Sequence, residues 1–180
     1  MTGGGLPMEV GMAFNSVLDE TLEAWRGVRD GVIAEVRNIP GGDFDFRPTP
    51  KSRSVTQLAQ HILEVAMMMT GELTRPDTDF HRAPWLKLLA LYAKPAYQAK
   101  TKAPLVRLLK AQQRDAERQF RKAGSLALYQ FIARFDGQPG TKLAWLNHGI
   151  AHEEYHRGQL ALYARLLGRV PALTQLIEGG

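Results

Sequence analysis

The stretch 151-AHEEYHRGQLALYARLLGRVP-171 decides the fold, because it combines a long helical pattern with a pair of closely spaced histidines. His152 and His156 are four residues apart, so on a helix they are rotated by only about 40° and separated by about 6 Å along the axis. Their imidazoles can therefore converge on one ion. Gly168 is typical of the position just beyond a helix, which predicts that this helix ends near Leu167.

Three further segments carry apolar residues at helical spacing, and little of the sequence alternates as a strand would. The four predicted long helices are residues 15–37, 54–73, 104–124 and 141–167. Ser54, followed three residues later by Gln57, has the pattern of a capping box at the start of the second helix. The connection 74–102 is long enough to cross a helical bundle, so the second and third helices can run parallel, and it holds a short predicted helix at 85–93. The sequence therefore predicts an all-α fold with essentially no sheet.

Length and composition are those of one ordinary globular domain. The chain has 180 residues, of which 44% are hydrophobic and 23% charged, so we expect a single domain over 1–180 with a flexible, glycine-rich segment at 1–12. Cysteine is absent, so any metal ligands must be His, Asp or Glu. The N-terminus lacks the pattern of a signal peptide, and no apolar run reaches the roughly 18 residues that span a bilayer. We therefore expect a cytoplasmic protein that does not enter a membrane.

The net charge of +5 raises the question of nucleic-acid binding. Basic residues recur along the third predicted helix, at Arg107, Lys110, Arg114, Arg118 and Arg121. Acidic residues interrupt this stripe, and no aromatic residues alternate with the cations as platforms for bases. The pattern is typical of a solvated helix face, so a nucleic-acid partner is not expected.

The histidine pair is predicted to face the core. The arc of the helix centred on His152 contains Trp145, His148, Tyr155, Gln159, Tyr163 and Leu166. Burial of two imidazoles is unfavourable unless their nitrogens find partners, and one metal ion is a partner for both. Two hydrogen-bonded core histidines would explain the same spacing, so the HxxxH pattern alone leaves both interpretations open.

The rest of the sequence narrows these alternatives. The relevant motifs are HEEYHRGQL at 152–160 with the residues up to Pro171, Phe46-Arg47-Pro48, Ser54-Val55, and His61. With these motifs the chain resembles the DinB/YfiT-like family of metalloenzymes from about residue 14 to residue 171. The resemblance implies a four-helix bundle in up-down-down-up order. It also implies a divalent metal ion held by one histidine of the second helix and two of the fourth, which here are His61, His152 and His156.

Three histidine ligands leave at least one coordination position for water or substrate, which is typical of a catalytic rather than a structural site. The resembled family includes thiol-dependent S-transferases and an isomerase, beside proteins described as metal-dependent hydrolases. We therefore expect an enzyme that uses Zn, Ni or Fe to activate a low-molecular-weight thiol or water for transfer to a small electrophilic substrate. A metal-dependent hydrolase and a non-catalytic, stress-related metal-binding protein stay open, as does a homodimer.

Three further side chains are candidates for catalytic roles. Glu64 lies one turn beyond His61 and could act as a base or hold that histidine in place. Tyr155 and Gln159 could orient the substrate, together with Tyr163.

Two other histidines are not expected to bind the ion. His148 is about 12 Å from His156 along the helix, too far to share an ion with it, and is expected to line the pocket or support the ligands. His81 is expected on a surface loop. Gly158, inside the fourth helix, is expected to allow close helix packing. If the three proposed ligands have the ordinary histidine pKa near 6.5, protons should displace the ion between about pH 7 and 5.

Overall fold

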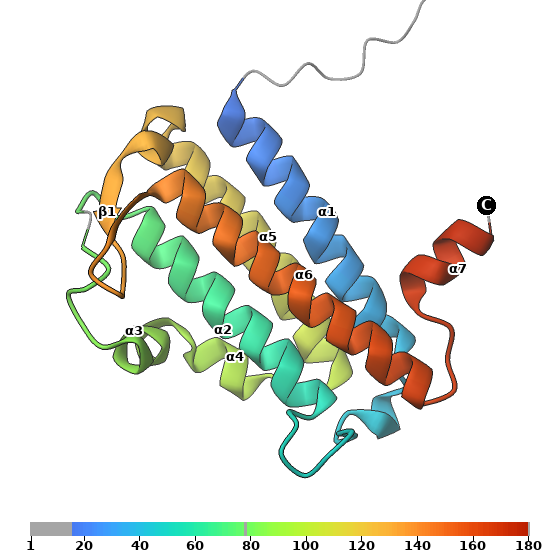
Figure 1. Cartoon of the computed structure of the whole chain (residues 1–180). Coiled ribbons are helices and arrows are strands. Elements are labelled where there is room, and N and C mark those ends of the chain that lie inside the picture. Colours follow the sequence, from blue (N-terminus) through green and yellow to red (C-terminus); the bar gives the residue numbers. More distant parts are fainter. Residues whose placement is uncertain (1–15, 78, 180) are drawn as a thin grey trace, which may run out of the picture.

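The computed structural model describes residues 16–77 and 79–179, so the segment 1–12, which was expected to be flexible, lies outside the described residues. The described chain is an all-α, up-down-down-up four-helix bundle (Figure 1). Its long helices are α1 (Val17–Asn38), α2 (Val55–Leu73), α5 (Lys102–Ala123) and α6 (Lys142–Leu166). Helices α1 and α2 each pack against both α5 and α6. Helix α1 therefore lies diagonally opposite α2, and α5 lies diagonally opposite α6.

The helix ends follow the local signals in the sequence. The capping box at Ser54 is present: its hydroxyl accepts from the backbone N–H of Gln57, and the Gln57 side chain accepts from the backbone N–H of Ser54. Gly124 and Gly168 follow α5 and α6 with φ of 85° and 74°, a left-handed region that favours glycine. Helix α5 begins at Lys102, slightly earlier than the Pro104 start that we predicted.

The long connection between α2 and α5 runs back along α2 to the end of the bundle where α2 begins (Figure 1). It contains α3 (Trp85–Tyr92), where the short helix was predicted, and α4 (Lys94–Gln98). Because of this crossover α2 and α5 run in the same direction, and α6 runs antiparallel to α2. None of the helices in the described part of the chain is long and apolar enough to cross a membrane.

The described chain contains one two-stranded sheet, which is small enough to agree with the expectation of essentially no sheet. Strands β1 (Phe131–Ala133) and β2 (Pro139–Thr141) pair antiparallel in a hairpin just before α6, with Ile132 opposite Gly140. The strands are three residues long, too short to show an alternating pattern, and β2 begins with Pro139 and Gly140. The remaining short elements are the 3-10 helices η1 (Gly41–Asp43) and η2 (Ser125–Tyr129), and the C-terminal helix α7 (Ala172–Glu178).

The buried core has two apolar clusters with a polar layer between them. Along α1, for example, Trp25 belongs to one cluster and Val32 to the other, with the buried Arg29 between them. Arg29 and Glu153 are 0% and 1% exposed and form a bidentate ion pair, with Nε–Oε2 at 2.8 Å and Nη2–Oε1 at 2.5 Å. The indole N–H of Trp25 also donates to Glu153, and Arg29 donates to the side chain of Gln112. The layer therefore ties α1, α5 and α6 together.

Breaking this ion pair should destabilise the fold strongly. The substitution Arg29→Met leaves the Glu153 carboxylate buried without its cation, a change that costs about 3–5 kcal/mol in comparable pairs. Urea denaturation of the protein, with chelator present, measures the free energy of unfolding. The matched control is Arg118→Gln, because the Arg118–Asp115 pair is largely exposed and should be worth less than about 1 kcal/mol. Equal losses in the two variants would contradict this account of the core.

Candidate metal centre

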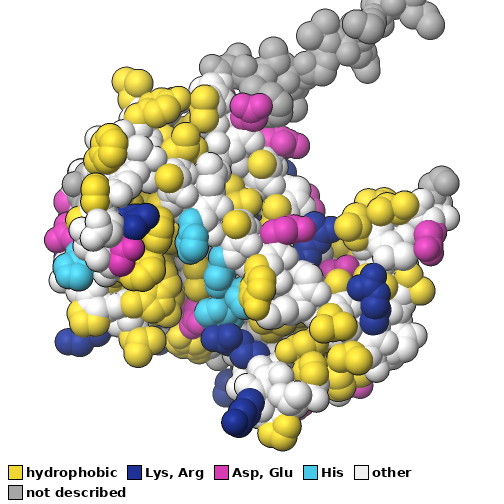
Figure 2. Space-filling view, viewed as in Figure 1, with side chains coloured by type: hydrophobic (Ala, Val, Ile, Leu, Met, Phe, Trp, Pro, Cys, Tyr) yellow, Lys and Arg dark blue, Asp and Glu magenta, His cyan; other side chains and the backbone are white. Residues whose placement is uncertain are grey.

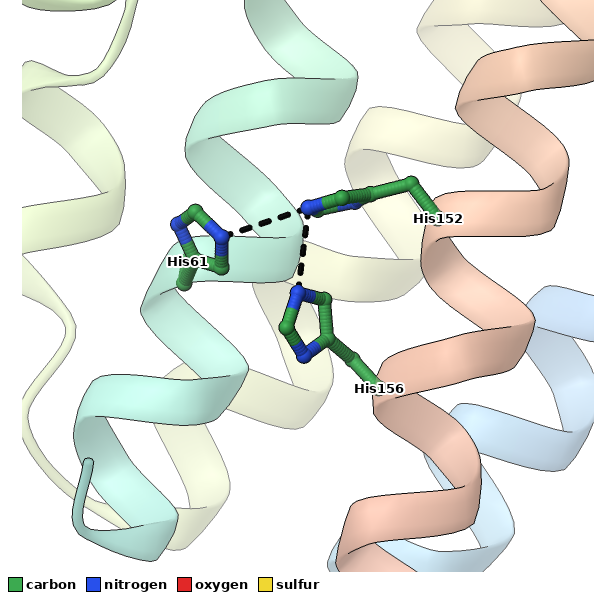
Figure 3. A group of neighbouring side chains, drawn as sticks. All are labelled: His61, His152 and His156. Atoms are coloured by element: carbon green, nitrogen blue, oxygen red, sulfur yellow. Dashed lines mark hydrogen bonds between the residues drawn. The ribbon is translucent and has the colours of Figure 1, made fainter. Parts of the chain in front are cut away.

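Histidine side chains meet between α2 and α6 at the middle of the bundle and are visible at the molecular surface (Figure 2). His61 comes from α2, and His152 and His156 come from successive turns of α6 (Figure 3). The Nε2 atom of His152 lies 3.2 Å from Nε2 of His61 and 3.0 Å from Nε2 of His156. The three potential ligand atoms all lie within 4.8 Å of one another. The antiparallel arrangement of α2 and α6 thus brings the three histidines together, as predicted.

The second ring nitrogen of two histidines is already engaged. Nδ1 of His61 lies 2.5 Å from the Glu64 carboxylate, and Nδ1 of His156 lies 2.8 Å from Oε1 of Gln159. A carboxylate and an amide oxygen accept hydrogen bonds, so both Nδ1 atoms carry the proton and both Nε2 atoms present a lone pair. These lone pairs are directed towards His152.

The three histidines alone cannot give every one of their ring nitrogens a hydrogen-bond partner. Nε2 of His152 faces the lone pairs of both other histidines but can donate its single proton to one of them, so the other lone pair has no donor. Burial of an unpaired polar atom is unfavourable, whereas a cation between the three Nε2 atoms would satisfy all three lone pairs. Nitrogens about 2.0–2.1 Å from a tetrahedral zinc lie roughly 3.3 Å apart, close to the two shorter separations. The donor set therefore fits a divalent metal ion.

The site is open on one side. Among the described residues no fourth His, Asp or Glu joins the three histidines, and the side chain of His61 remains 16% exposed. A tetrahedral ion held by three protein ligands keeps a position for an exchangeable molecule, which is the arrangement of catalytic sites.

Burial and hydrogen bonding shift the pKa values of the centre. Burial lowers the pKa of His152 to about 3, and His156 and His61 act in the same direction. Burial also lowers the pKa of His156, although its hydrogen bond with Gln159 opposes the shift. For Glu64, burial raises the pKa, but the hydrogen bonds from His61 and Tyr97 outweigh this and leave the pKa below its ordinary value. The centre therefore combines neutral imidazoles at His152 and His156 with an ionised Glu64, the protonation state that metal binding requires.

The three candidate catalytic residues lie around the centre with different contacts. Glu64 and Gln159 hold the rings of His61 and His156, so both support ligands directly. Tyr155 is 65% exposed, and its ring contacts that of His156 with centroids 5.0 Å apart. Tyr155 therefore lies at the rim, where it can meet an incoming molecule.

The remaining aromatic and histidine candidates make their hydrogen bonds and ring contacts with residues outside the cluster of three histidines. Tyr163 is buried, and its hydroxyl donates to the backbone carbonyl of Arg53, so it anchors a loop. His148 is exposed and stacks on the ring of Trp145. His81 lies on an exposed loop, as expected.

The face of α6 that is buried in the structure differs from the face that the sequence predicted. Leu166, predicted to be buried, is 56% exposed, whereas Glu153 is buried beside Leu160 and Ala164. The sequence did contain a signal that an acidic residue of another helix is buried. Arg29 falls on the apolar stripe of α1, and a cation at such a position needs a buried anion from another helix.

Comparison with known proteins agrees with this architecture. The sequence model of the DinB family matches residues 12–178, so the chain belongs to the DinB family. The fold is similar to that of a DinB-like protein, YjoA, from Bacillus subtilis, with a TM-score of 0.64 and 18% identity over 84% of this chain and 93% of that one. A candidate DinB family member from Exiguobacterium sibiricum 255-15 gives a TM-score of 0.60 and 24% identity, over 85% and 93%. At these identities the two structures show a shared fold. No protein of curated function matches the sequence.

Removal of any one histidine of the cluster should abolish stoichiometric metal binding. We expect His61→Ala, His152→Ala and His156→Ala each to lower bound metal severely after dialysis, because two imidazoles remain where three converge. Elemental analysis of the purified variants measures the metal content. The matched controls are His81→Ala and His148→Ala, which should retain the content of the unmodified protein. Full occupancy in His61→Ala would refute the assignment of α2 to the site.

The lowered pKa values revise the expected pH dependence. In the metal-free protein His152 has a pKa of about 3, against an ordinary value near 6.5 in the unfolded chain. Between these values the unfolded chain binds a proton that the folded chain does not, so the stability of the metal-free protein should fall as pH decreases from about 6.5 towards 3. Protons should also compete with the metal less strongly between pH 7 and 5 than they would at three histidines with the ordinary pKa near 6.5.

Thermal melts of metal-free protein at a series of pH values test this sign. The variant His152→Leu removes the titrating group and should flatten the decline, while His81→Ala should leave it unchanged. A decline of the same steepness in His152→Leu would show that other groups cause it.

Proposed function

We propose that this protein is a metal-dependent enzyme that activates a low-molecular-weight thiol and transfers it to a small electrophilic substrate. The observation that carries the proposal is the convergence of three Nε2 atoms, from His61, His152 and His156, at a site with no fourth ligand among the described residues. Zn, Ni and Fe are the ions that we expect there, since imidazole ligands suit all three.

A divalent ion at three neutral imidazoles lowers the pKa of a bound thiol or water and so supplies a nucleophile near neutral pH. The residues of the chain prepare the site for this. Glu64 fixes the ring of His61, and the hydroxyl of Tyr97 donates to the other carboxylate oxygen of Glu64. Gln159 fixes the ring of His156 in the same way. Such partners of ligands keep the donor nitrogens aimed at the ion.

A thiol fits these contacts better than water does. Hydrolysis calls for a base that takes a proton from the attacking water, and Glu64 is the carboxylate next to the centre. Both of its oxygens are engaged, one by His61 and the other by Tyr97. A free thiol ionises near pH 8.5 and free water at 15.7, so a thiol needs a smaller shift from the ion and less help from a base. The engaged state of Glu64 therefore supports thiol transfer over hydrolysis.

The setting of the proposed reaction follows from the same chemistry. Low-molecular-weight thiols stay reduced in the cytoplasm, so that is where we propose the protein works. Every residue of the site comes from one chain, so a homodimer is compatible with the proposal but is not required for it.

Activity of the metal-loaded protein tests the proposal. Protein loaded with Zn, Ni or Fe is incubated with cysteine or glutathione and the electrophile chlorodinitrobenzene, and the absorbance of the thioether product is followed. We expect metal-dependent acceleration that disappears in His152→Ala and falls by about 10- to 100-fold in Glu64→Gln, because Glu64 orients a ligand. His81→Ala serves as the control.

Two results would contradict thiol transfer. Hydrolysis of a nitrophenyl ester without any thiol requirement would favour the hydrolase. Full metal occupancy with no acceleration for any thiol or ester would favour a non-catalytic metal-binding protein.

A further inference from the structure

A cavity of about 420 Å³ opens directly beside the metal centre. Its walls are the start of α2, the loop before it and the crossover helix α4. His61, one of the three clustered histidines, lines this cavity together with Glu64 and Tyr97. A molecule in the cavity would therefore contact the centre on the α2 side.

The cavity carries an excess of positive charge. Arg47, Lys51 and Arg53 line it, and none of them forms an ion pair with another described residue. The carboxylate in the wall is that of Glu64, and His61 and Tyr97 already occupy its two oxygens. Figure 2 shows Lys and Arg side chains gathered immediately beside the histidines. The three cations thus outnumber the single carboxylate of the lining, and the cavity keeps a net positive charge.

The loop that carries these cations is fixed against the helix that supplies two of the histidines. The buried Tyr163 of α6 donates to the backbone carbonyl of Arg53 at 3.1 Å, and its ring packs edge-on against Phe46 with centroids 5.8 Å apart. The backbone N–H of Val55 also donates to the carbonyl of Phe46, which closes the loop at its base. Both ends of the segment 47–53 are therefore held in a defined position relative to α6.

We propose that this cavity binds an anionic group, a carboxylate or a phosphate, of the small molecule that reacts at the metal centre. Arginine guanidinium groups can bind such oxyanions through two parallel hydrogen bonds, and lysine adds a point charge. The anion lies on Arg47, Lys51 and Arg53, while the reacting end of the molecule lies at the three histidines. The inference rests on the proposed function and adds the charge class of the ligand to it.

Thiols that differ only in charge test the proposal on cobalt-loaded protein. Each thiol is titrated into the protein separately: the acids are mercaptopropionate and mercaptohexanoate, and the matching alcohols are mercaptopropanol and mercaptohexanol. The thiolate-to-cobalt absorption band reports binding without any turnover. We expect the acid of at least one chain length to bind about tenfold more tightly than the matching alcohol. Arg47→Gln and Arg53→Gln should each reduce this preference to less than about threefold and leave the affinity for the alcohols unchanged.

The control variant is Arg165→Gln, because Arg165 is an exposed cation without an ion pair in the described structure and lies outside the cavity. It should retain the tenfold preference. If unmodified protein shows no preference for the acid at either length, or if Arg165→Gln abolishes the preference as Arg53→Gln does, the proposal is overturned.

A second titration separates this proposal from the proposed function. Metal-free protein is titrated with inorganic phosphate at constant ionic strength, and the backbone amide resonances of residues 47–53 are followed by NMR. We expect saturable shifts that are lost in the double variant Arg47→Gln/Arg53→Gln. Absence of shifts overturns the anion site, whether or not the histidines bind metal. Shifts without any preference for the acid thiols overturn its link to the metal centre.

Discussion

The buried ion pair between Arg29 and Glu153 is the interaction on which the rest of the structure depends. Glu153 lies about 100° from His152 and about 60° from His156 around α6. Because Arg29, Trp25 and their neighbours hold Glu153 in the centre of the bundle, α6 cannot turn about its axis. Both histidines are thereby directed towards α2. A structural contact between α1 and α6 thus determines the geometry of the metal centre.

The buried ion pair has a desolvation cost that an apolar core would avoid. Two desolvated charges contribute little net stability even when they are well paired, and a hydrophobic layer is often as stable. Here the polar layer continues from Arg29 through Gln112 to Thr70 of α2, so every long helix has one polar group at the same level. An apolar helix face could slide or rotate against its neighbours with small losses, whereas this layer is satisfied in a single register. That register is the one in which the clustered histidines meet.

The sequence predicted what depends on local spacing and missed what depends on contacts between helices. Helix bounds, the capping box and the HxxxH pair follow from neighbouring residues, and the family motifs added His61. The partner of Arg29 lies on another helix, so no local pattern named it. Gly158 shows the same limit: an added Cβ there would meet nothing within 4 Å, so close packing does not explain it. The close approach occurs instead at Gly31 of α1, where a Cβ would lie 2.5 Å from Nε of Arg157.

The long crossover is part of the site as well as of the topology. By returning the chain to the starting end of the bundle it makes α2 and α6 antiparallel neighbours, and it also lays α4 along α2. Helix α4 carries Tyr97, whose hydroxyl donates to Glu64, while Glu64 accepts from the ring of His61. The orientation of one histidine therefore depends on the crossover, and that of the other two on the ion pair at Glu153. Two separate parts of the fold must be in place before the three imidazoles converge, which makes the donor geometry a property of the whole bundle.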